Sequence, residues 1–296
     1  YYDVKLKEDR GKILLSYSNY KFLKQDISED NFINVLSKLN PNLIINLAAQ
    51  AGVRHSITNP EDYVKNNITG FLNILEYSKN AKNLDRLVYA STSSVYGGNE
   101  KSPFSEKDSV DHPLQFYAVT KRTNELMAHS YSSLFNIETV GLRFFTVYGP
   151  WGRPDMAPMI FTKAILSKQP IKIFNNGNMK RDFTFIDDVV ESVLRVLAEI
   201  PLALDTDTCG YENAESSSRI LNIGNGSPVS LMEFVDILEK CVGKKARIKF
   251  VKFQPGDVKS TFADMTEFKH LTGFEFRTSL EVGLKKFVSW YTSYFK

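Results

Sequence analysis

Cysteine and histidine are scarce in this sequence. Only two cysteines and four histidines occur among its 296 residues, and they are widely spread. Two cysteines in unrelated surroundings build no disulfide framework, and scattered histidines do not indicate a structural metal site. We therefore expect no metal, and a reducing, cytoplasmic location. The residues concerned are Cys209, Cys241, His55, His112, His129 and His270.

Long apolar runs and a concentrated charge of one sign are also missing. No apolar run approaches the ~20 residues needed to cross a bilayer, and the opening YYDVKLKEDR is too polar for a signal peptide. The net charge is only +3, whereas a nucleic-acid-binding protein carries a concentrated basic face. The apolar fraction of 43% and the charged fraction of 24% are typical of soluble globular proteins. We expect neither a membrane nor nucleic acid as a partner.

Glycine is nearly absent from the first 50 residues, where Gly11 is the only one before Gly52. Nucleotide-binding parallel sheets usually open with a strand, a glycine-rich turn and a helix that receives the pyrophosphate. No such motif lies near Tyr1. We expect that a first βαβ piece of roughly 30 residues precedes this sequence; the alternative is a sheet that binds no dinucleotide.

The sequence does contain short apolar, β-branched runs that alternate with helical patterns. These runs are apolar on both faces, as are strands of a parallel sheet covered by helices. Apolar residues at helical spacing predict helices at 32–39, 67–80, around Tyr117 and at 187–200. This order predicts right-handed βαβ units and a doubly wound, Rossmann-like α/β sheet. The predicted strands are 43–48, 86–91, 139–145 and 219–224.

The last third of the chain is less regular. Ser230 is a predicted N-cap with Glu233 at the reciprocal capping-box position, and Gly243 is a predicted helix stop. A short strand is expected at 247–251 and a surface loop at 205–218. We predict two domains. Residues 1–150 form the nucleotide-binding domain, to which 181–200 and 219–224 return, and 151–296 form mainly a smaller α/β substrate domain.

The stretch QFYAVTKRTNEL places Tyr117 one helical turn before Lys121. The bare spacing is not specific, since Tyr1/Lys5, Tyr17/Lys21 and Tyr20/Lys24 share it. Only Tyr117/Lys121 follows a predicted strand that runs directly into Thr92, Ser93 and Ser94. Ligands of such sheets bind at the carboxyl ends of the strands.

These residues can form an acid/base device. A lysine ammonium favours the tyrosinate and lowers the tyrosine pKa from ~10. The phenolate can then take a proton from a substrate hydroxyl, while the hydroxyl of Thr92 holds that oxygen.

Several segments in order resemble the extended short-chain dehydrogenase/reductases, in particular the NAD-dependent sugar-nucleotide epimerases and dehydratases. These are NLAAQAGVRHS, YVKNNITGFLNIL, ASTSSVYGG, YAVTKRTNE, LRFFTVYGPWGRPDM, RDFTFIDDVV, LNIGNGSPVSL and QPGDVKSTFAD. The fifth of them and the opening YYDVKLKEDR are most similar to UDP-glucuronate 4-epimerases.

The resemblance implies roles for individual residues. Thr92, Tyr117 and Lys121 would be catalytic, and Lys121 would also hold the nicotinamide ribose of NAD. The other positions match cofactor-binding residues (Asp26, Ile27, Leu47, Ala48, Ala49, Gln50, Asn67 and Phe145) or substrate-binding residues (Ser93, Ser94, Thr146, Arg153, Arg181 and Asp257), with Arg181 on the diphosphate. The resemblance also implies a homodimer in which the helix of Tyr117 packs.

Structural interpretations stay open for some of these residues. Asn67 could cap a helix, Arg153 could be a surface arginine, and Arg181 could form a surface ion pair with Asp182. Asp187 and Asp188 open an apolar helix, where acids suit the helix dipole.

The implied reaction is epimerisation of a UDP-sugar, most similar to conversion of UDP-glucuronate to UDP-galacturonate. Tyr117 would remove the O4′ proton while the C4′ hydride passes to NAD⁺, and the hydride would return to the other face of the rotated 4-keto sugar. A 4-keto uronate is a β-keto acid that can lose CO₂. We hypothesise that Thr92, Ser93, Ser94 and Thr146, with Arg153 as counter-charge, fix its carboxylate in a protective rotamer.

Other functions compete with this one. An epimerase for UDP-N-acetylglucosamine or UDP-glucose would differ in few residues. A 4,6-dehydratase would carry acids where STSSVYG has hydroxyls, and a decarboxylase would need an acid near them. A non-catalytic NAD or sugar-nucleotide sensor is the alternative from another class, which intact Thr92, Tyr117 and Lys121 disfavour.

Overall fold

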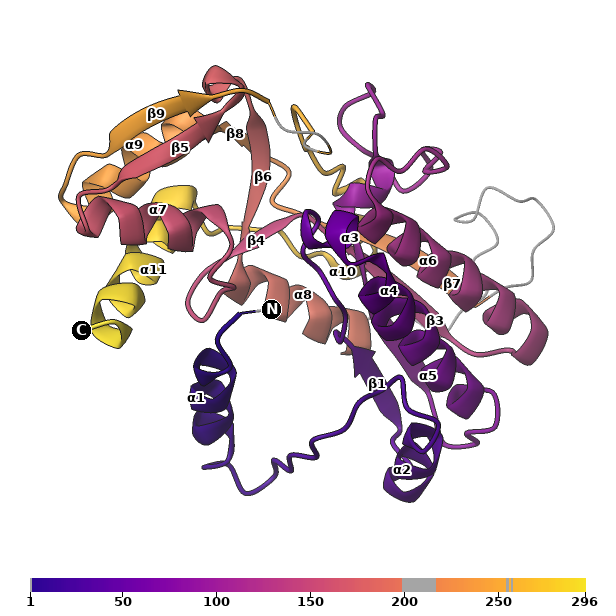
Figure 1. The fold of residues 1–296 in the computed structure, drawn as a ribbon. Coiled ribbons are helices and arrows are strands. Elements are labelled where there is room, and N and C mark those ends of the chain that lie inside the picture. The colour runs from indigo at the N-terminus through magenta and orange to yellow at the C-terminus, as the bar shows by residue number, and fades with distance from the viewer. Residues whose placement is uncertain (1, 199–216, 254–255, 257) are drawn as a thin grey trace.

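A four-stranded parallel sheet organises the larger part of the molecule (Figure 1). The computed structural model describes residues 2–198, 217–253, 256 and 258–296. The strands lie in the order β1 (Leu43–Asn46), β2 (Arg86–Thr92), β3 (Thr139–Phe144) and β7 (Ser218–Ile223). The predicted parallel α/β sheet is thus confirmed, with all four strands where the apolar runs placed them.

Helices cover both faces of this sheet, as the two-sided apolar strands predict. Leu87 and Tyr89 of β2 point to one face, where they pack with α2 (Phe32–Leu39), α5 (Gly70–Ser78) and α6 (Phe116–Phe135). Val88, between them, points to the other face and packs with α8 (Ile186–Ala198) and α10 (Thr266–Thr272). Alternate residues of one strand therefore serve two hydrophobic cores.

A smaller α/β part with its own core lies beside this sheet (Figure 1). Strands β4 (Thr146–Tyr148), β6 (Lys180–Phe185) and β8 (Pro228–Ser230) form one sheet, and β5 (Pro170–Phe174) pairs with β9 (Arg247–Val251) in parallel. Helices α7 (Ala157–Leu166), α9 (Leu231–Val242) and α11 (Leu280–Tyr294) pack around them. A short 3₁₀ turn, η3 (Asn175–Gly177), follows β5.

The predicted N-cap at Ser230, the helix stop at Gly243 and the strand at 247–251 are confirmed. The hydroxyl of Ser230 accepts a hydrogen bond from the backbone N of Glu233 (3.1 Å). Gly243 ends α9 in the left-handed conformation, at φ 73°. The predicted strand 247–251 is β9. Of the predicted loop 205–218, residues 205–216 lie outside the described residues, and Ser218 already belongs to β7.

The stretch before α5 differs from the predicted single helix over 67–80. Short helices α3 (His55–Thr58) and α4 (Pro60–Tyr63) lead into a π-helix, η1 (Val64–Thr69), and α5 follows. A π-helix is rare and is frequent at functional sites.

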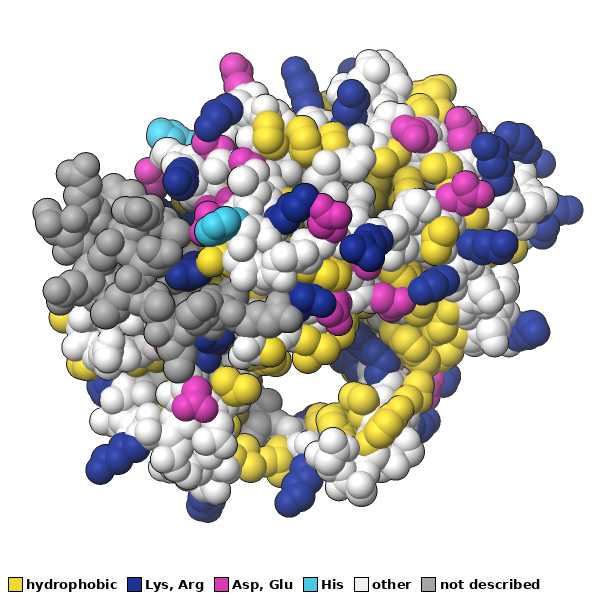
Figure 2. Space-filling view, turned by 180° about the vertical axis from the view of Figure 1, so that it is seen from behind, with side chains coloured by type: hydrophobic (Ala, Val, Ile, Leu, Met, Phe, Trp, Pro, Cys, Tyr) yellow, Lys and Arg dark blue, Asp and Glu magenta, His cyan; other side chains and the backbone are white. Residues whose placement is uncertain are grey.

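Helix α1 (Lys5–Leu14) stands apart from the sheet, on the side of α11 (Figure 1). The hydroxyl of Tyr294 donates a hydrogen bond to Asp9 (2.8 Å). Seen from behind, the molecule is hollowed, and hydrophobic side chains lie around the opening (Figure 2). Among the helices that the structure describes, none is long and apolar enough to span a bilayer.

Candidate active site

Tyr117 and Lys121 lie on the first turns of α6, which begins next to the carboxyl end of β2. The backbone N of Tyr117 donates to the hydroxyl of Ser56 (3.2 Å), which fixes the start of the helix against the segment after β1. The exposed fraction is 9% for Tyr117 and 3% for Lys121. Both line a cavity of about 2200 Å³. The predicted pair is therefore held close to the sheet rather than on a solvated surface.

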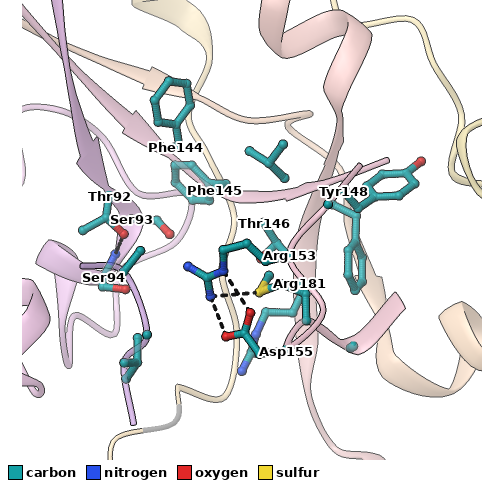
Figure 3. A pocket seen from close by; sticks show the side chains of 18 of the residues that line it. Thr92, Ser93, Ser94, Phe144, Phe145, Thr146, Tyr148, Arg153, Asp155 and Arg181 are labelled. Atoms are coloured by element: carbon teal, nitrogen blue, oxygen red, sulfur yellow. Dashed lines mark hydrogen bonds and ion pairs between the residues drawn. The ribbon is translucent and has the colours of Figure 1, made fainter. Parts of the chain in front are cut away.

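Hydroxyl groups converge on the same cavity from two strand ends (Figure 3). Thr92 ends β2, and its hydroxyl accepts from the backbone N of Ser94 (3.2 Å) at the start of the 3₁₀ helix η2 (Ser93–Tyr96). The adjacent strand β3 ends at Phe144, and Thr146 opens β4 across the cavity. Parallel strands bring both groups to one edge.

The electrostatics of the pair differ from the expectation. Burial raises the pKa of Tyr117, with smaller lowering contributions from the Thr92 hydroxyl and the charge of Arg153. Burial also lowers the pKa of Lys121 to about 8, against the charge of Glu125. The expected net lowering of the Tyr117 pKa is wrong for this structure, because burial outweighs the groups that favour the tyrosinate. The ammonium of Lys121 donates a hydrogen bond to Asn124 (3.1 Å).

Two arginines lie near each other on the far wall of the cavity (Figure 3). Arg153 donates to both carboxylate oxygens of Asp155 (3.0 and 2.9 Å) and to the sulfur of Met156 (3.5 Å). Arg181 donates to the carbonyls of Lys180 (2.8 Å) and Lys259 (3.2 Å).

The interpretation of Arg181 and Asp182 as a surface ion pair is wrong. The exposed fraction of Asp182 is 0%. Its carboxylate accepts from the backbone N of Asn225 (2.8 Å), Gly226 (3.0 Å) and Ala263 (3.0 Å). Successive residues of a strand point to opposite faces, so Arg181 turns to the cavity while Asp182 turns inward.

Asn67 is a buried link between elements, and its interpretation as a helix N-cap is wrong because it lies inside η1. Its side chain accepts from the backbone N of Gln50 (2.8 Å) and donates to the carbonyl of Gln50 (3.0 Å) and to the hydroxyl of Thr120 (2.9 Å). Asn67 thereby joins the segment after β1 to α6.

The structure brings most, but not all, of the predicted site residues to one cavity. Those that line it are Thr92, Tyr117, Lys121, Leu47, Ala49, Phe145, Ser93, Ser94, Thr146, Arg153 and Arg181. Those away from its lining are Asp26, Ile27, Ala48, Gln50 and Asn67, and Asp257 lies outside the described residues. Asp26 instead accepts from the backbone N (2.9 Å) and hydroxyl (2.7 Å) of Ser28.

Sequence reasoning missed several polar residues that support the pair. Asn124, three residues after Lys121, was detectable by its helical spacing. Ser56 lies 61 residues before Tyr117, and no local pattern indicates such a contact. Within the described ranges, no group of three or more His, Cys, Asp or Glu side chains could hold a metal.

Comparisons with known proteins identify relatives of this chain. The model of the NAD dependent epimerase/dehydratase family matches residues 3–205. The chain is 49% identical to the protein CapI of Staphylococcus aureus, over 100% of this chain and 89% of the relative. It is 43% identical to a UDP-glucuronate 4-epimerase of Arabidopsis thaliana, over 100% and 69%.

A solved structure shares the architecture as well. The UDP-glucuronic acid 4-epimerase from Bacillus cereus, in complex with UDP-glucuronic acid and NAD, superposes with a TM-score of 0.86 at 34% identity, over 98% of this chain and 87% of that one. The parallel sheet, the buried tyrosine–lysine pair at its carboxyl edge and the match over most of the chain lead to one conclusion. The chain belongs to the NAD-dependent epimerase/dehydratase family.

Proposed function

We propose that this protein is a UDP-glucuronate 4-epimerase that works with NAD. The observation that carries the proposal is that Thr92, Tyr117 and Lys121 line the same cavity as Thr146 and Arg153. The first three supply acid/base chemistry at a sugar hydroxyl, and the last two can recognise a uronate. The relatives from Arabidopsis thaliana and Bacillus cereus carry this activity in their names.

The residues present fit the nicotinamide half of NAD. The ammonium of Lys121 has three N–H donors, and among the described residues Asn124 is its one hydrogen-bond acceptor. A buried cation with unused donors, on the wall of a cavity, suits the vicinal hydroxyls of a ribose. We propose that Lys121 and Tyr117 hold that ribose, with Leu47, Ala49 and Phe145 along the cofactor. NAD supplies the acceptor and donor of the C4′ hydride.

The protein's own residues handle the proton. Tyr117 takes the proton of O4′ as the sugar is oxidised and gives it back when the sugar is reduced. Thr92 holds the same oxygen, because it lines the same cavity as Tyr117 and lowers the pKa of that tyrosine.

The rotamer of the uronate carboxylate must be fixed, because the 4-keto intermediate can otherwise lose CO₂. We propose that Ser93, Ser94 and Thr146 donate hydrogen bonds to it and that Arg153 balances its charge. Arg181 is proposed to pair with the diphosphate, because a guanidinium fork suits phosphate oxygens. These roles, and those of Asp26, Ile27, Ala48, Gln50, Asn67 and Asp257, rest on the family resemblance.

We also propose that residues 1–150, with 181–200 and 219–224, form the NAD-binding domain, and that 151–296 form mainly the substrate domain. A homodimer through α6 is proposed because that helix exposes large apolar side chains at Leu126, Leu134 and Phe135.

The test is to incubate the protein with NAD and either UDP-glucuronate or UDP-N-acetylglucosamine, and to follow C4′ by NMR. We expect the C4′ epimer from UDP-glucuronate without release of CO₂. If only UDP-N-acetylglucosamine were epimerised, the protein would be an epimerase for that class of substrate instead. A product that lacks the carboxyl group would identify a decarboxylase. If neither sugar reacted, the alternative of a non-catalytic binding protein would be favoured.

A further inference from the structure

The side-chain amide of Asn124 accepts a hydrogen bond from the ammonium of Lys121. The exposed fraction of Asn124 is 2%. Its Oδ1 accepts from Nζ of Lys121 (3.1 Å), and its Nδ2 donates to the backbone carbonyl of Asn67 (2.7 Å). The oxygen and the nitrogen of the amide therefore have one partner each. A flipped amide would place its nitrogen against the ammonium of Lys121 and its oxygen against the carbonyl of Asn67, so neither hydrogen bond could form.

The carbonyl that anchors Asn124 belongs to the π-helix η1. A π-turn is wider than an α-turn, and here the carbonyl of Asn67 receives the side chain of Asn124 from the neighbouring helix. The anchor is itself fixed, since the Asn67 side chain bonds Gln50 and Thr120. The bonds thus run from the segment after β1, through η1, to Lys121 on α6.

The carboxylate of Glu125 lies near Lys121, but it already accepts hydrogen bonds from other residues. Glu125 follows Asn124 on α6, and both of its oxygens accept from Arg143 on β3 (2.9 and 2.9 Å). Ser91 (2.6 Å) and Arg122 (3.2 Å) also donate to it. The neutral amide, rather than the buried anion, is consequently the acceptor that fixes the ammonium.

We propose that Asn124 is a positioning residue that fixes the ammonium of Lys121 in place for its work with Tyr117. The amide oxygen of Asn124 accepts from the ammonium and its nitrogen is anchored on the carbonyl of Asn67. The inference rests on the proposed function.

The test compares Asn124→Ala and Asn124→Asp with Thr123→Ala. Thr123 is the adjacent residue, and its hydroxyl donates to the carbonyl of Val119 in the same helix (3.0 Å). We expect Asn124→Ala to lower kcat for UDP-glucuronate about tenfold to a hundredfold, the cost of one buried hydrogen bond to a charged group. KM for the sugar should change little. NAD affinity, measured by quenching of tryptophan fluorescence, should fall severalfold. Thr123→Ala should match the wild type.

The pH profile separates positioning from a structural role. Removal of the acceptor disfavours the ammonium, so the alkaline limb of kcat/KM should move to lower pH in Asn124→Ala. A carboxylate favours the ammonium, so the limb should move to higher pH in Asn124→Asp. The ionisable groups around Lys121, namely Tyr117 and Glu125 on α6 and Arg143 on β3, are unchanged in both variants.

The inference would be overturned if the pH profiles of kcat/KM for both variants overlaid that of the wild type and the loss of kcat simply followed a lower melting temperature. The wild type must first epimerise UDP-glucuronate. An inactive wild type refutes the proposed function, whereas an active wild type with unshifted variants refutes only the role of Asn124.

Discussion

The side chain of Tyr117 is buried, but its proposed role as a base requires the tyrosinate form. Burial alone would keep its hydroxyl protonated. The groups that oppose burial are the hydroxyl of Thr92 and the charge of Arg153, which come from two other elements. These two groups favour the tyrosinate, but burial still outweighs them in this structure.

Replacement of Tyr117 by Phe tests its role as the acid/base group. We expect kcat for UDP-glucuronate to fall by about 10²–10⁴-fold, the usual contribution of a positioned acid or base, with NAD still bound. Stopped assays of epimer formation measure this. Tyr131→Phe is the control, because Tyr131 lies on the same helix and its hydroxyl donates to Glu76 (2.5 Å), away from the cavity. Unchanged activity in Tyr117→Phe would refute the assignment.

Arg153 and Thr146 are predicted to set the preference for a uronate. Arg153→Ala or Thr146→Ala should lower the ratio of kcat/KM for UDP-glucuronate to that for UDP-glucose by about tenfold or more, since a charged hydrogen bond is lost. Arg153→Lys keeps the charge without the fork and should lie between. An unchanged ratio in the alanine variants would show that the carboxylate is held elsewhere.

Part of this site follows from the sequence and part does not. Thr92, Tyr117 and Lys121 are recognisable because strand order places them at one edge. Asn124 is detectable by its helical spacing from Lys121. Ser56 and Asp182 are not recognisable as partners, because their donors, such as Tyr117 and Asn225, lie far away in the sequence. The pKa of Tyr117 shows the same limit, since the burial that raises it cannot be read from the spacing to Lys121.

At the scale of elements, apolar pattern predicts the strands well and the stretch before α5 poorly. β1, β2, β3 and β7 are apolar on both faces, and that signal is strong. The extra residue of a π-turn leaves no periodic trace in VKNNIT. Its reason lies in another element, because Asn67 in this turn contacts Gln50 and α6.

Asp182 joins β6 to two other segments and is predicted to be a major contributor to stability. Asp182→Ala would leave three backbone donors unpaired, each worth about 1–3 kcal/mol when buried. We expect the free energy of unfolding to fall by about 3 kcal/mol or more in urea titrations. Asp187→Ala is the matched control, because Asp187 is 62% exposed and pairs with Lys286 at the surface. It should lose less than about 1 kcal/mol. Equal losses would contradict the role of Asp182.

At the scale of the whole molecule, one carboxyl links the segment before α6 to the last strand of the sheet. Glu106 accepts from the backbone N of Asn222 in β7 (2.7 Å). Burial raises its pKa from 4.5 to about 7. The fold thus favours the protonated form, so its contribution to stability is complete below pH 4.5 and is lost as pH rises through about 7.

Glu106→Gln is predicted to remove part of the pH dependence of stability. The amide keeps an acceptor for Asn222 but does not ionise. Between pH 5 and pH 8 the wild type should lose up to about 3 kcal/mol more than the variant, which melting curves at both values would show. Glu100→Gln, an exposed carboxyl of the same segment, should behave like the wild type. Identical slopes for Glu106→Gln and the wild type would contradict the prediction.

The place of β7 beside β3 has a consequence for the protein as it is made. Everything from β4 to α8 is translated between these two neighbours. At about 5–20 residues per second, Ser218 leaves the ribosome roughly 4–15 s after Phe144. During that interval β3 presents an unpaired edge, which can template pairing with another chain. The nascent polypeptide, rather than the finished enzyme, is therefore the form in which this edge of the sheet is open to pairing with another chain.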